Sequence, residues 1–304
     1  MIAALGSIAL DTTRTPMGAV IDVPGGSATY FSLSSTLFSK TCLISRVGRD
    51  FPQSFLDLLS AKGASLGAVE IAAGKTMRYH STFNADYSQR TSDLTELNVL
   101  TDFNPVLTNG VRKSRFVYLG TLPPSTQLSV LGQFGDPKLV VMDTIEYFIK
   151  HSKQDLLKVL SKVNGIVIND HEAGLLAGGN IISCGKKILG YGADFCVIKK
   201  GEHGSILLHS DGSVTAFPAF PLEVVVDPTG AGDAFAGGFM GFLAKAGSSR
   251  KADLKKAMAW GTVMGAFAAE SMATSLLEKM TLAQVESRYR IYRDAMHFES
   301  AASA

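Results

Sequence analysis

The sequence predicts an α/β fold in three layers, in which a largely parallel central sheet lies between helices and carries a small β lid. Two observations lead to this prediction. Short runs of valine, isoleucine and leucine alternate with longer amphipathic segments, which is typical of βα units around a parallel sheet. Two polar segments interrupt that alternation, and their residue pattern favours strands with one solvated face.

The central sheet is expected to contain the short apolar runs. We predict strands at residues 2–8, 41–47, 116–119, 139–143, 165–169, 195–199 and 224–226. Helices are predicted at residues 51–62, 154–163, 234–245 and 257–272. In the first of these helices, Phe55, Leu58 and Leu59 share one face, and Gly63 follows as a stop signal.

The two polar segments cover residues 11–24 and roughly 75–100. In the second segment, Tyr79, His80 and Thr82 stand in a half-alternating pattern that suits a strand with one wet face. The sequence contains no internal repeat and no proline-rich linker. We therefore expect residues 1–304 to form one domain, with both polar segments inserted into it as the lid.

The composition excludes several classes of protein. Apolar residues make up 46% of the chain and charged residues 18%, which is a globular balance. A net charge of +2 gives no strong field, so we expect neither nucleic acid nor a membrane as a partner. No segment offers the roughly 20 uninterrupted apolar residues of a membrane span. Three cysteines without paired spacing argue against disulfides or a zinc site and favour the cytoplasm.

The strongest motif is the run from Asp227 to Phe235, which follows the predicted strand at 224–226. Where a strand runs into glycines and then into a helix, backbone N–H groups at the positive helix end form an anion site. Gly230 and Gly232 allow a phosphate to approach closely. In phosphoryl transfer, a carboxylate beside that phosphate orients the acceptor hydroxyl and takes its proton. Asp233 is therefore predicted to be the catalytic base, with helix capping as the alternative.

This run resembles the C-terminal signature of the ribokinase-like, or PfkB-type, carbohydrate kinases, Asp-Thr-x-Gly-Ala-Gly-Asp, and the resemblance extends over nearly the whole chain. The resemblance implies a kinase that uses ATP, with Asp233 as the base. It also implies that the backbone of Gly230, Ala231 and Gly232 stabilises the transferring phosphoryl group. Pro228 stands where the signature usually has threonine, so this chain lacks one backbone donor and one hydroxyl there.

Two further motifs resemble those of the same family. Asn169 and Glu172 match its Asn-x-x-Glu motif, which implies that they hold a hydrated Mg²⁺, although a capping box explains the same spacing. Lys199, Gly201 and Gly204 match a turn that lines the nucleotide, and a solvated hairpin is the alternative.

The resemblance also extends to weaker nucleotide and cation contacts. Gly261 lies in a stretch that resembles the helix beside the adenine ring, although small residues on a helix more often indicate close packing. Thr229 is expected among the nucleotide contacts. Asp227 lies in a region that resembles the potassium site of some relatives.

The acceptor site is expected near the N-terminus. Gly25 and Gly26 precede an amphipathic helix and resemble the family's Gly-Gly signature, against which a substrate hydroxyl lies. Asp11 matches the family's carboxylate that grips two substrate hydroxyls. Tyr30 stands where many ribose and fructose kinases carry asparagine, so the acceptor stays open. Tyr30 and Arg78 are expected to line its pocket.

The sequence therefore predicts an ATP- and Mg²⁺-dependent kinase that phosphorylates a hydroxyl of a sugar or polyol. A nucleoside kinase of the adenosine type and a non-catalytic metabolite sensor are the alternatives. The resemblance also implies a homodimer, because lid strands in this family often pair between subunits.

Overall fold

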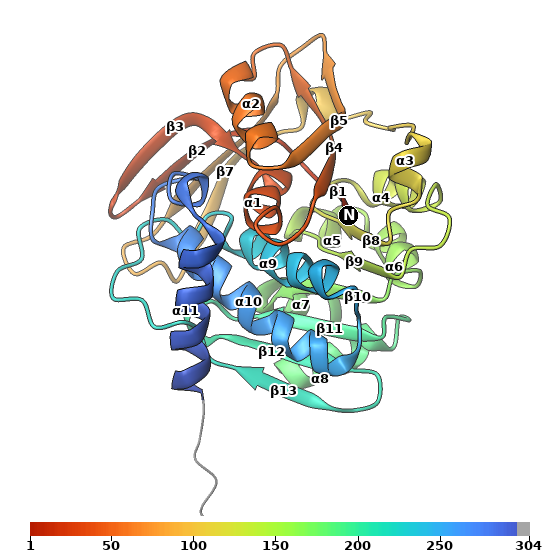
Figure 1. Cartoon of the computed structure of the whole chain (residues 1–304), viewed down its shortest axis with the longest axis vertical. Coiled ribbons are helices and arrows are strands. Elements are labelled where there is room, and N and C mark those ends of the chain that lie inside the picture. Colours follow the sequence, from red (N-terminus) through yellow and green to blue (C-terminus); the bar gives the residue numbers. More distant parts are fainter. Residues whose placement is uncertain (297–304) are drawn as a thin grey trace, which may run out of the picture.

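The computed structural model describes residues 1–296, which form a nine-stranded sheet covered by helices and a separate four-stranded sheet (Figure 1). The larger sheet has the strand order β13-β12-β11-β10-β9-β8-β1-β4-β5. Its strands are β1 (Ile2–Leu5), β4 (Thr41–Gly48), β5 (Ala64–Ala72), β8 (Phe116–Leu119), β9 (Leu139–Met142), β10 (Gly165–Asn169), β11 (Phe195–Lys199), β12 (Ser205–His209) and β13 (Val214–Phe217). All neighbours are parallel except the pairs β11–β12 and β12–β13, which confirms the largely parallel sheet.

The central strands are apolar along their whole length because both of their faces are covered. Every residue of β1, β8 and β9 is buried. Successive side chains point to opposite faces, so Ile2 and Ala4 belong to one hydrophobic core while Ala3 and Leu5 belong to the other.

Each core lies under its own layer of helices. One layer contains α1 (Ser27–Ser35), α2 (Gln53–Ala61), α9 (Ala231–Ala246), α10 (Lys251–Ala269) and α11 (Leu282–Ala295). The other contains α3 (Asn109–Arg112), α4 (Pro124–Leu131), α5 (Glu146–His151), α6 (Lys153–Leu160), α7 (Asp170–Ala177) and α8 (Ile181–Leu189). The predicted three-layer α/β fold is confirmed.

The predicted strand at residues 224–226 is wrong. These valines belong to the irregular segment between β13 and α9, where Val224 is exposed. The amide of Val226 donates to the carbonyl of Ala269 at the end of α10 (2.8 Å) instead of joining a ladder. The apolar run therefore lies against a helix end, and β13 remains the edge of the sheet.

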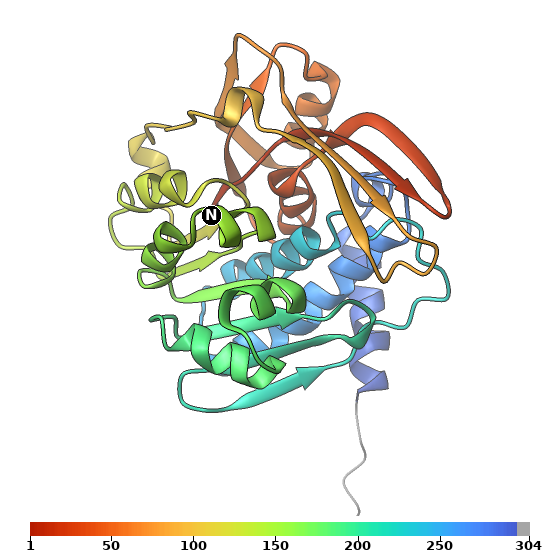
Figure 2. The ribbon, with the colours of Figure 1, turned by 180° about the vertical axis from the view of Figure 1, so that it is seen from behind.

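The smaller sheet has the order β3-β2-β6-β7, and Figure 2 shows its red and gold strands to one side of the central sheet. Its strands are β2 (Ala9–Thr15), β3 (Gly18–Gly25), β6 (Met77–Phe83) and β7 (Arg90–Glu96). The parallel register of β2 and β6 sets Ala9 beside Met77 and Asp11 beside Tyr79. Two segments far apart in the sequence thus build one sheet, which we call the small sheet.

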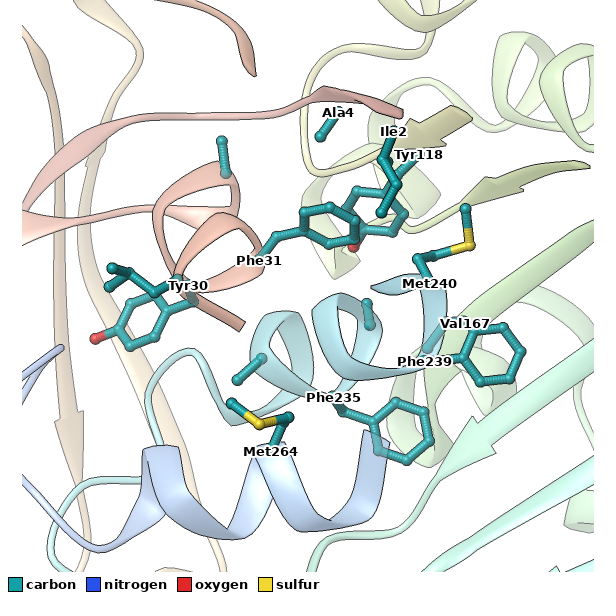
Figure 3. Packing of buried hydrophobic residues seen from close by; sticks show 14 of the residues in the cluster. Ile2, Ala4, Tyr30, Phe31, Tyr118, Val167, Phe235, Phe239, Met240 and Met264 are labelled. Carbon is teal, nitrogen blue, oxygen red and sulfur yellow. The ribbon is translucent and has the colours of Figure 1, made fainter. Parts of the chain in front are cut away.

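Close packing of α1 against α9 fixes the helix that carries the strongest motif (Figure 3). A Cβ atom at Gly237 of α9 would overlap the carbonyl of Phe31 on α1, so glycine permits this approach. The ring of Phe31 stacks on Tyr118 of β8, with centroids 4.1 Å apart. Helix α9 therefore packs closely on α1, and α1 in turn packs on the central sheet.

Within residues 1–296, no helix is both long enough and apolar enough to cross a membrane. The cysteines Cys42, Cys184 and Cys196 are buried, and none of them forms a disulfide.

Candidate active site

The glycine turn before α9 is shaped by side chains from distant parts of the chain. Gly230 has a left-handed backbone (φ 73°), and a Cβ atom there would overlap the ring of Tyr30. The Asp227 carboxylate accepts hydrogen bonds from the amides of Thr229 (2.9 Å) and Ala273 (3.0 Å). The turn is therefore held in place independently of any ligand.

The first turn of α9 presents free donors. Among residues 1–296, the amides of Gly232 and Asp233 donate to no backbone carbonyl, as expected at a helix N-terminus. A Cβ atom at Gly232 would lie 2.8 Å from the Lys199 ammonium nitrogen. Glycine at this position thus lets a lysine from β11 reach the same point as the free amides, which together suit a phosphate.

A cluster of charged side chains lies at the carboxyl ends of three neighbouring strands. Asp143 follows β9, Glu172 lies in the first turn after β10, and Lys199 ends β11. Asp143 Oδ2 accepts from Lys199 Nζ (3.3 Å) and from the Tyr118 hydroxyl (3.2 Å). Ligands of α/β sheets bind at this edge, so the cluster stands where a substrate is expected.

The cluster changes the acidity of Asp233. Burial raises its pKa to about 7, and the negative charge of Asp143 acts in the same direction. The positive charges of Lys199 and Arg90 oppose this rise. A carboxylate with a pKa near neutrality can accept a proton during catalysis and release it afterwards.

Glu172 and Lys199 are affected by the same neighbours. Burial and the charge of Asp143 raise the pKa of Glu172 to about 7, against the effect of Lys199. Burial lowers the pKa of Lys199, but the charges of Asp143, Glu172 and Asp233 outweigh burial and raise it overall. Lys199 therefore keeps its positive charge beside the glycine turn.

Asp11 lies on β2 with a carboxylate oxygen ready for a ligand. Its Oδ2 accepts from the Gly26 amide (3.1 Å), whereas its Oδ1 is buried and has no partner in residues 1–296. Burial raises the pKa of Asp11 to about 7, the Gly26 bond lowers it, and the charges of Asp233 and Asp227 raise it further. A Cβ atom at Gly25 would overlap the Asp11 carboxylate, which explains this glycine. A buried acceptor without a donor fits a substrate hydroxyl.

The structure corrects the expectation for Arg78. Neighbouring residues of a strand point to opposite faces, so Arg78 lies on the face of the small sheet opposite to that of Tyr79 and Asp11. Its guanidinium pairs with Asp22 and with Asp50 (3.1 Å to Oδ2). These contacts tie β6 to β3 and to the segment after β4, so Arg78 is already paired within the chain.

Tyr30 is also placed differently from the expectation. Its side chain is buried, and its ring lies under Gly230 and points away from the Phe31–Tyr118 stack (Figure 3). Tyr30 therefore supports the glycine turn from below and does not form an open wall of the acceptor pocket.

Asn169 and Glu172 form the capping box that was the alternative to a metal site. Asn169 Oδ1 accepts from the Glu172 amide (2.8 Å), and Glu172 Oε2 accepts from the Asn169 amide (3.1 Å). Glu172 Oε1 makes no hydrogen bond within the described chain. Mg²⁺ commonly keeps several waters and takes one or two carboxylates plus phosphates, so this remaining oxygen fits a hydrated Mg²⁺.

The remaining predicted nucleotide contacts are spread around the same end of the sheet. Gly201 and Gly204 form the turn between β11 and β12, both with left-handed backbones (φ 54° and 80°). Thr229 is buried, and its hydroxyl lies 3.5 Å from that of Thr13 on β2. Gly261 faces the Phe235 carbonyl of α9, so close helix packing accounts for it without a nucleotide.

Two residues near the site, Asp143 and Arg90, were not predicted from the sequence. Asp143 could have been noticed as the polar residue that ends an apolar strand. Arg90 gave no signal, because only the pairing of β6 with β7 brings it opposite Phe83 and over the cluster. Its positive charge lowers the pKa of both Asp233 and Glu172, although burial and Asp143 prevail.

Known proteins resemble this chain over most of its length. A family model described as pfkB family carbohydrate kinase matches residues 12–280. A protein named cytidine kinase from Thermococcus kodakarensis is 31% identical over 267 residues, which cover 86% of this chain and 92% of the relative.

Solved structures share the fold at lower identity. A Methanocaldococcus jannaschii nucleoside kinase, described as an archaeal member of the ribokinase family, has a TM-score of 0.75 at 22% identity, covering 95% of this chain and 98% of the other. The Burkholderia thailandensis nucleoside kinase in complex with inosine has a TM-score of 0.74 at 20% identity, covering 96% and 97%. The fold predicted from the sequence is thus that of ribokinase-like proteins.

Proposed function

The chain belongs to the pfkB family of carbohydrate kinases and is a phosphotransferase that acts on hydroxyl groups, and from this premise we propose that it phosphorylates the sugar of a nucleoside with ATP. The observation that carries the catalytic part is the position of Asp233, beside the free amides that begin α9 and among Asp143, Lys199 and Arg90. The observation that favours a nucleoside over a free sugar or polyol is the similarity, over 86% of the chain, to a protein named cytidine kinase.

In the proposed reaction, the acceptor lies between Asp11 and Asp233. Asp11 Oδ1 binds a hydroxyl of the acceptor, and the Gly26 amide holds the Asp11 carboxylate in place through Oδ2. Asp233 takes the proton of the reacting hydroxyl while the oxygen bonds to the γ-phosphorus and the bond from that phosphorus to the β,γ-bridging oxygen breaks. ADP leaves with this oxygen, and the amides of Gly232 and Asp233 together with Lys199 stabilise the negative charge of the transferring group.

Kinases of this family use ATP, typically with Mg²⁺, and Glu172 would hold that ion through water with its free oxygen. Bound Mg²⁺ would neutralise phosphate charge. Asn169 positions Glu172 through the capping box. A potassium ion near Asp227 stays a prediction, as does a homodimer formed through the small sheet.

We propose that the small sheet acts as the lid of this site. The tip of its β6–β7 hairpin reaches the segment before the glycine turn, where the Tyr87 hydroxyl donates to the Val226 carbonyl (3.1 Å). Tyr87 adopts a left-handed backbone (φ 60°), which is uncommon outside glycine and supports a functional reason for this contact. A closed lid excludes water and so limits hydrolysis of ATP.

An acceptor panel tests the proposed function. Purified protein is incubated with Mg-ATP and, separately, with cytidine, uridine, adenosine, inosine, ribose, fructose or myo-inositol, and ADP and the phosphorylated product are measured together. We expect a nucleoside monophosphate and ADP in equal amounts. Phosphorylation of a free sugar or inositol alone would contradict the nucleoside proposal, and no product from any acceptor would support the non-catalytic alternative.

A further inference from the structure

A cavity of about 270 Å³ lies between the small sheet and helix α5. Strands β6 and β7 contribute Met77 and Thr95, and the segment after β7 contributes Leu97 and Thr101. The opposite wall comes from Thr121, which follows β8, and from Ile145, Tyr147 and Phe148 at the start of α5. We call this space the α5 cavity.

The α5 cavity adjoins the acceptor end of the site. Met77 pairs with Ala9 of β2. Asp11 lies two residues further along β2 on the same face, so its Cα atom is roughly 7 Å from that of Ala9. Ile145 follows the cluster residue Asp143 by two positions. A molecule bound at Asp11 therefore has the α5 cavity beside it.

Thr121 supplies a second connection between the cavity and the acceptor end. The preceding residue, Gly120, donates its amide to the carbonyl of Leu5 (2.7 Å), and a Cβ atom there would lie 3.4 Å from the Ser27 hydroxyl. Ser27 directly follows the Gly25-Gly26 pair. The segments that carry the glycine pair and the cavity residue Thr121 therefore contact each other.

The lining of the cavity carries no charged side chain. It combines apolar side chains with three threonines, and the hydroxyls of Thr95, Thr101 and Thr121 make no hydrogen bond to any residue from 1 to 296. A free sugar has polar groups all around, and burying them against apolar side chains without partners is costly. A planar base has apolar faces and a polar edge, which this lining matches.

Tyr147 is the residue best placed to contact such a ring. It is 52% exposed although it is large and aromatic, and it lines the α5 cavity. Its ring stacks on His151, with centroids 4.6 Å apart and planes 29° from parallel. An aromatic face beside a cavity can stack on any base, whatever polar groups the edge of that base carries, because every base has a π-face.

We propose that the α5 cavity binds the base of the acceptor, with Tyr147 stacking on its face and the threonine hydroxyls contacting its edge; this inference rests on the proposed nucleoside kinase function. A hydroxyl can donate or accept a hydrogen bond. The threonines therefore serve the amino group of cytosine and the carbonyl of uracil alike. The enzyme accepts both nucleosides, with kcat/KM values that differ by less than about tenfold.

Steady-state kinetics of Tyr147→Ala, Tyr147→Phe and Ile291→Ala test the inference, with cytidine and ATP varied in turn. Loss of the ring in Tyr147→Ala raises the KM for cytidine about tenfold or more while the KM for ATP changes less than about twofold. Tyr147→Phe keeps the ring and restores the cytidine KM to within about threefold. Ile291, which is 60% exposed on α11, is a control for loss of an exposed apolar side chain outside the site.

The outcomes separate the two levels of the proposal. If wild-type enzyme phosphorylates nucleosides but Tyr147→Ala leaves the cytidine KM within about twofold, the base lies elsewhere and the inference is wrong. If the kcat/KM values for uridine and cytidine differ by more than about 100-fold, groups other than the threonine hydroxyls contact the edge of the base. If the wild-type enzyme phosphorylates no nucleoside, the proposed function and the inference fail together.

Discussion

At the scale of single residues, the site is defined by carboxylates held close to one another. Asp11, Glu172 and Asp233 each have a pKa raised to about 7, chiefly by burial. Lys199 and Arg90 oppose this rise at Asp233 without cancelling it. Such carboxylates lose their protons close to neutral pH, so pH directly controls whether they can bind hydroxyls and accept protons.

This acidity predicts the pH dependence of the reaction. The proposed roles of Asp11, Glu172 and Asp233 all require the ionised form, which is lost as the pH falls through about 7. We expect kcat/KM to be constant above about pH 8. Below about pH 7 it should fall with a steeper slope than a single titrating group gives, because several carboxylates must be ionised. A coupled assay run across this range, with the coupling enzymes in excess, checks the profile. A flat profile down to about pH 5 would contradict these assignments.

Sequence alone singled out residues to which we assign the chemistry. Asp233, Gly230 and Gly232 were found because their spacing reflects local geometry, a turn that leads into a helix. The structure places Arg78 in ion pairs with Asp22 and Asp50, which were not predicted because the sequence pattern does not show which face of a strand meets the site. Asp143 and Tyr147 were not singled out, because their positions depend on how distant strands and helices pack.

At the scale of elements, the buried parallel strands were the easiest to predict. Both of their faces are covered, so they appear as continuous apolar runs. The edge strands β5 and β13 carry exposed residues at alternating positions, and this weaker pattern was missed. The run at 224–226 has the composition of a strand but packs on the end of α10, a tertiary contact that composition does not reveal.

The two arginines of the small sheet offer a matched pair of variants. Arg90 makes no ion pair within residues 1–296 and lies near Asp233 and Glu172, whereas Arg78 pairs with Asp22 and Asp50 on the other face. We expect Arg90→Gln to lower kcat/KM for ATP about tenfold at neutral pH, because losing this positive charge raises the pKa of Asp233 and Glu172 further and leaves less of each ionised. Arg78→Gln should change it less than about twofold, since partly exposed ion pairs contribute little.

Steady-state kinetics with ATP as the varied substrate distinguish the two variants, and thermal unfolding controls for damage to the sheet. Equal losses in both variants would mean that the small sheet acts only as a scaffold. Loss in Arg78→Gln alone would restore the original assignment of Arg78 to the active site.

At the scale of the whole molecule, the fold brings Asp11, near the N-terminus, close to Asp233, which lies more than 200 residues later. Their carboxylates influence each other, as the contribution of Asp233 to the raised pKa of Asp11 shows. Buried carboxylates that lie close together destabilise the folded protein when they are ionised. The unfolded chain releases the Asp233 proton near pH 4, the folded chain near pH 7, so stability falls as the pH rises between these values.

Replacing Asp233 by asparagine removes a buried charge that the folded protein tolerates poorly above pH 7. Asp233→Asn is therefore expected to be at least as stable as the wild-type protein at about pH 8, as measured by chemical denaturation. This expectation makes the variant a suitable test of chemistry, because a loss of activity would not reflect a loss of structure.

The most direct test of the account is a single-turnover measurement with enzyme in excess over cytidine and saturating Mg-ATP, comparing wild type with Asp233→Asn. We predict that the wild-type enzyme forms cytidine monophosphate and that Asp233→Asn, still folded and still binding cytidine, forms it about 10²–10⁴-fold more slowly. Formation by Asp233→Asn at a rate within about tenfold of wild type would contradict the role of Asp233 as the base.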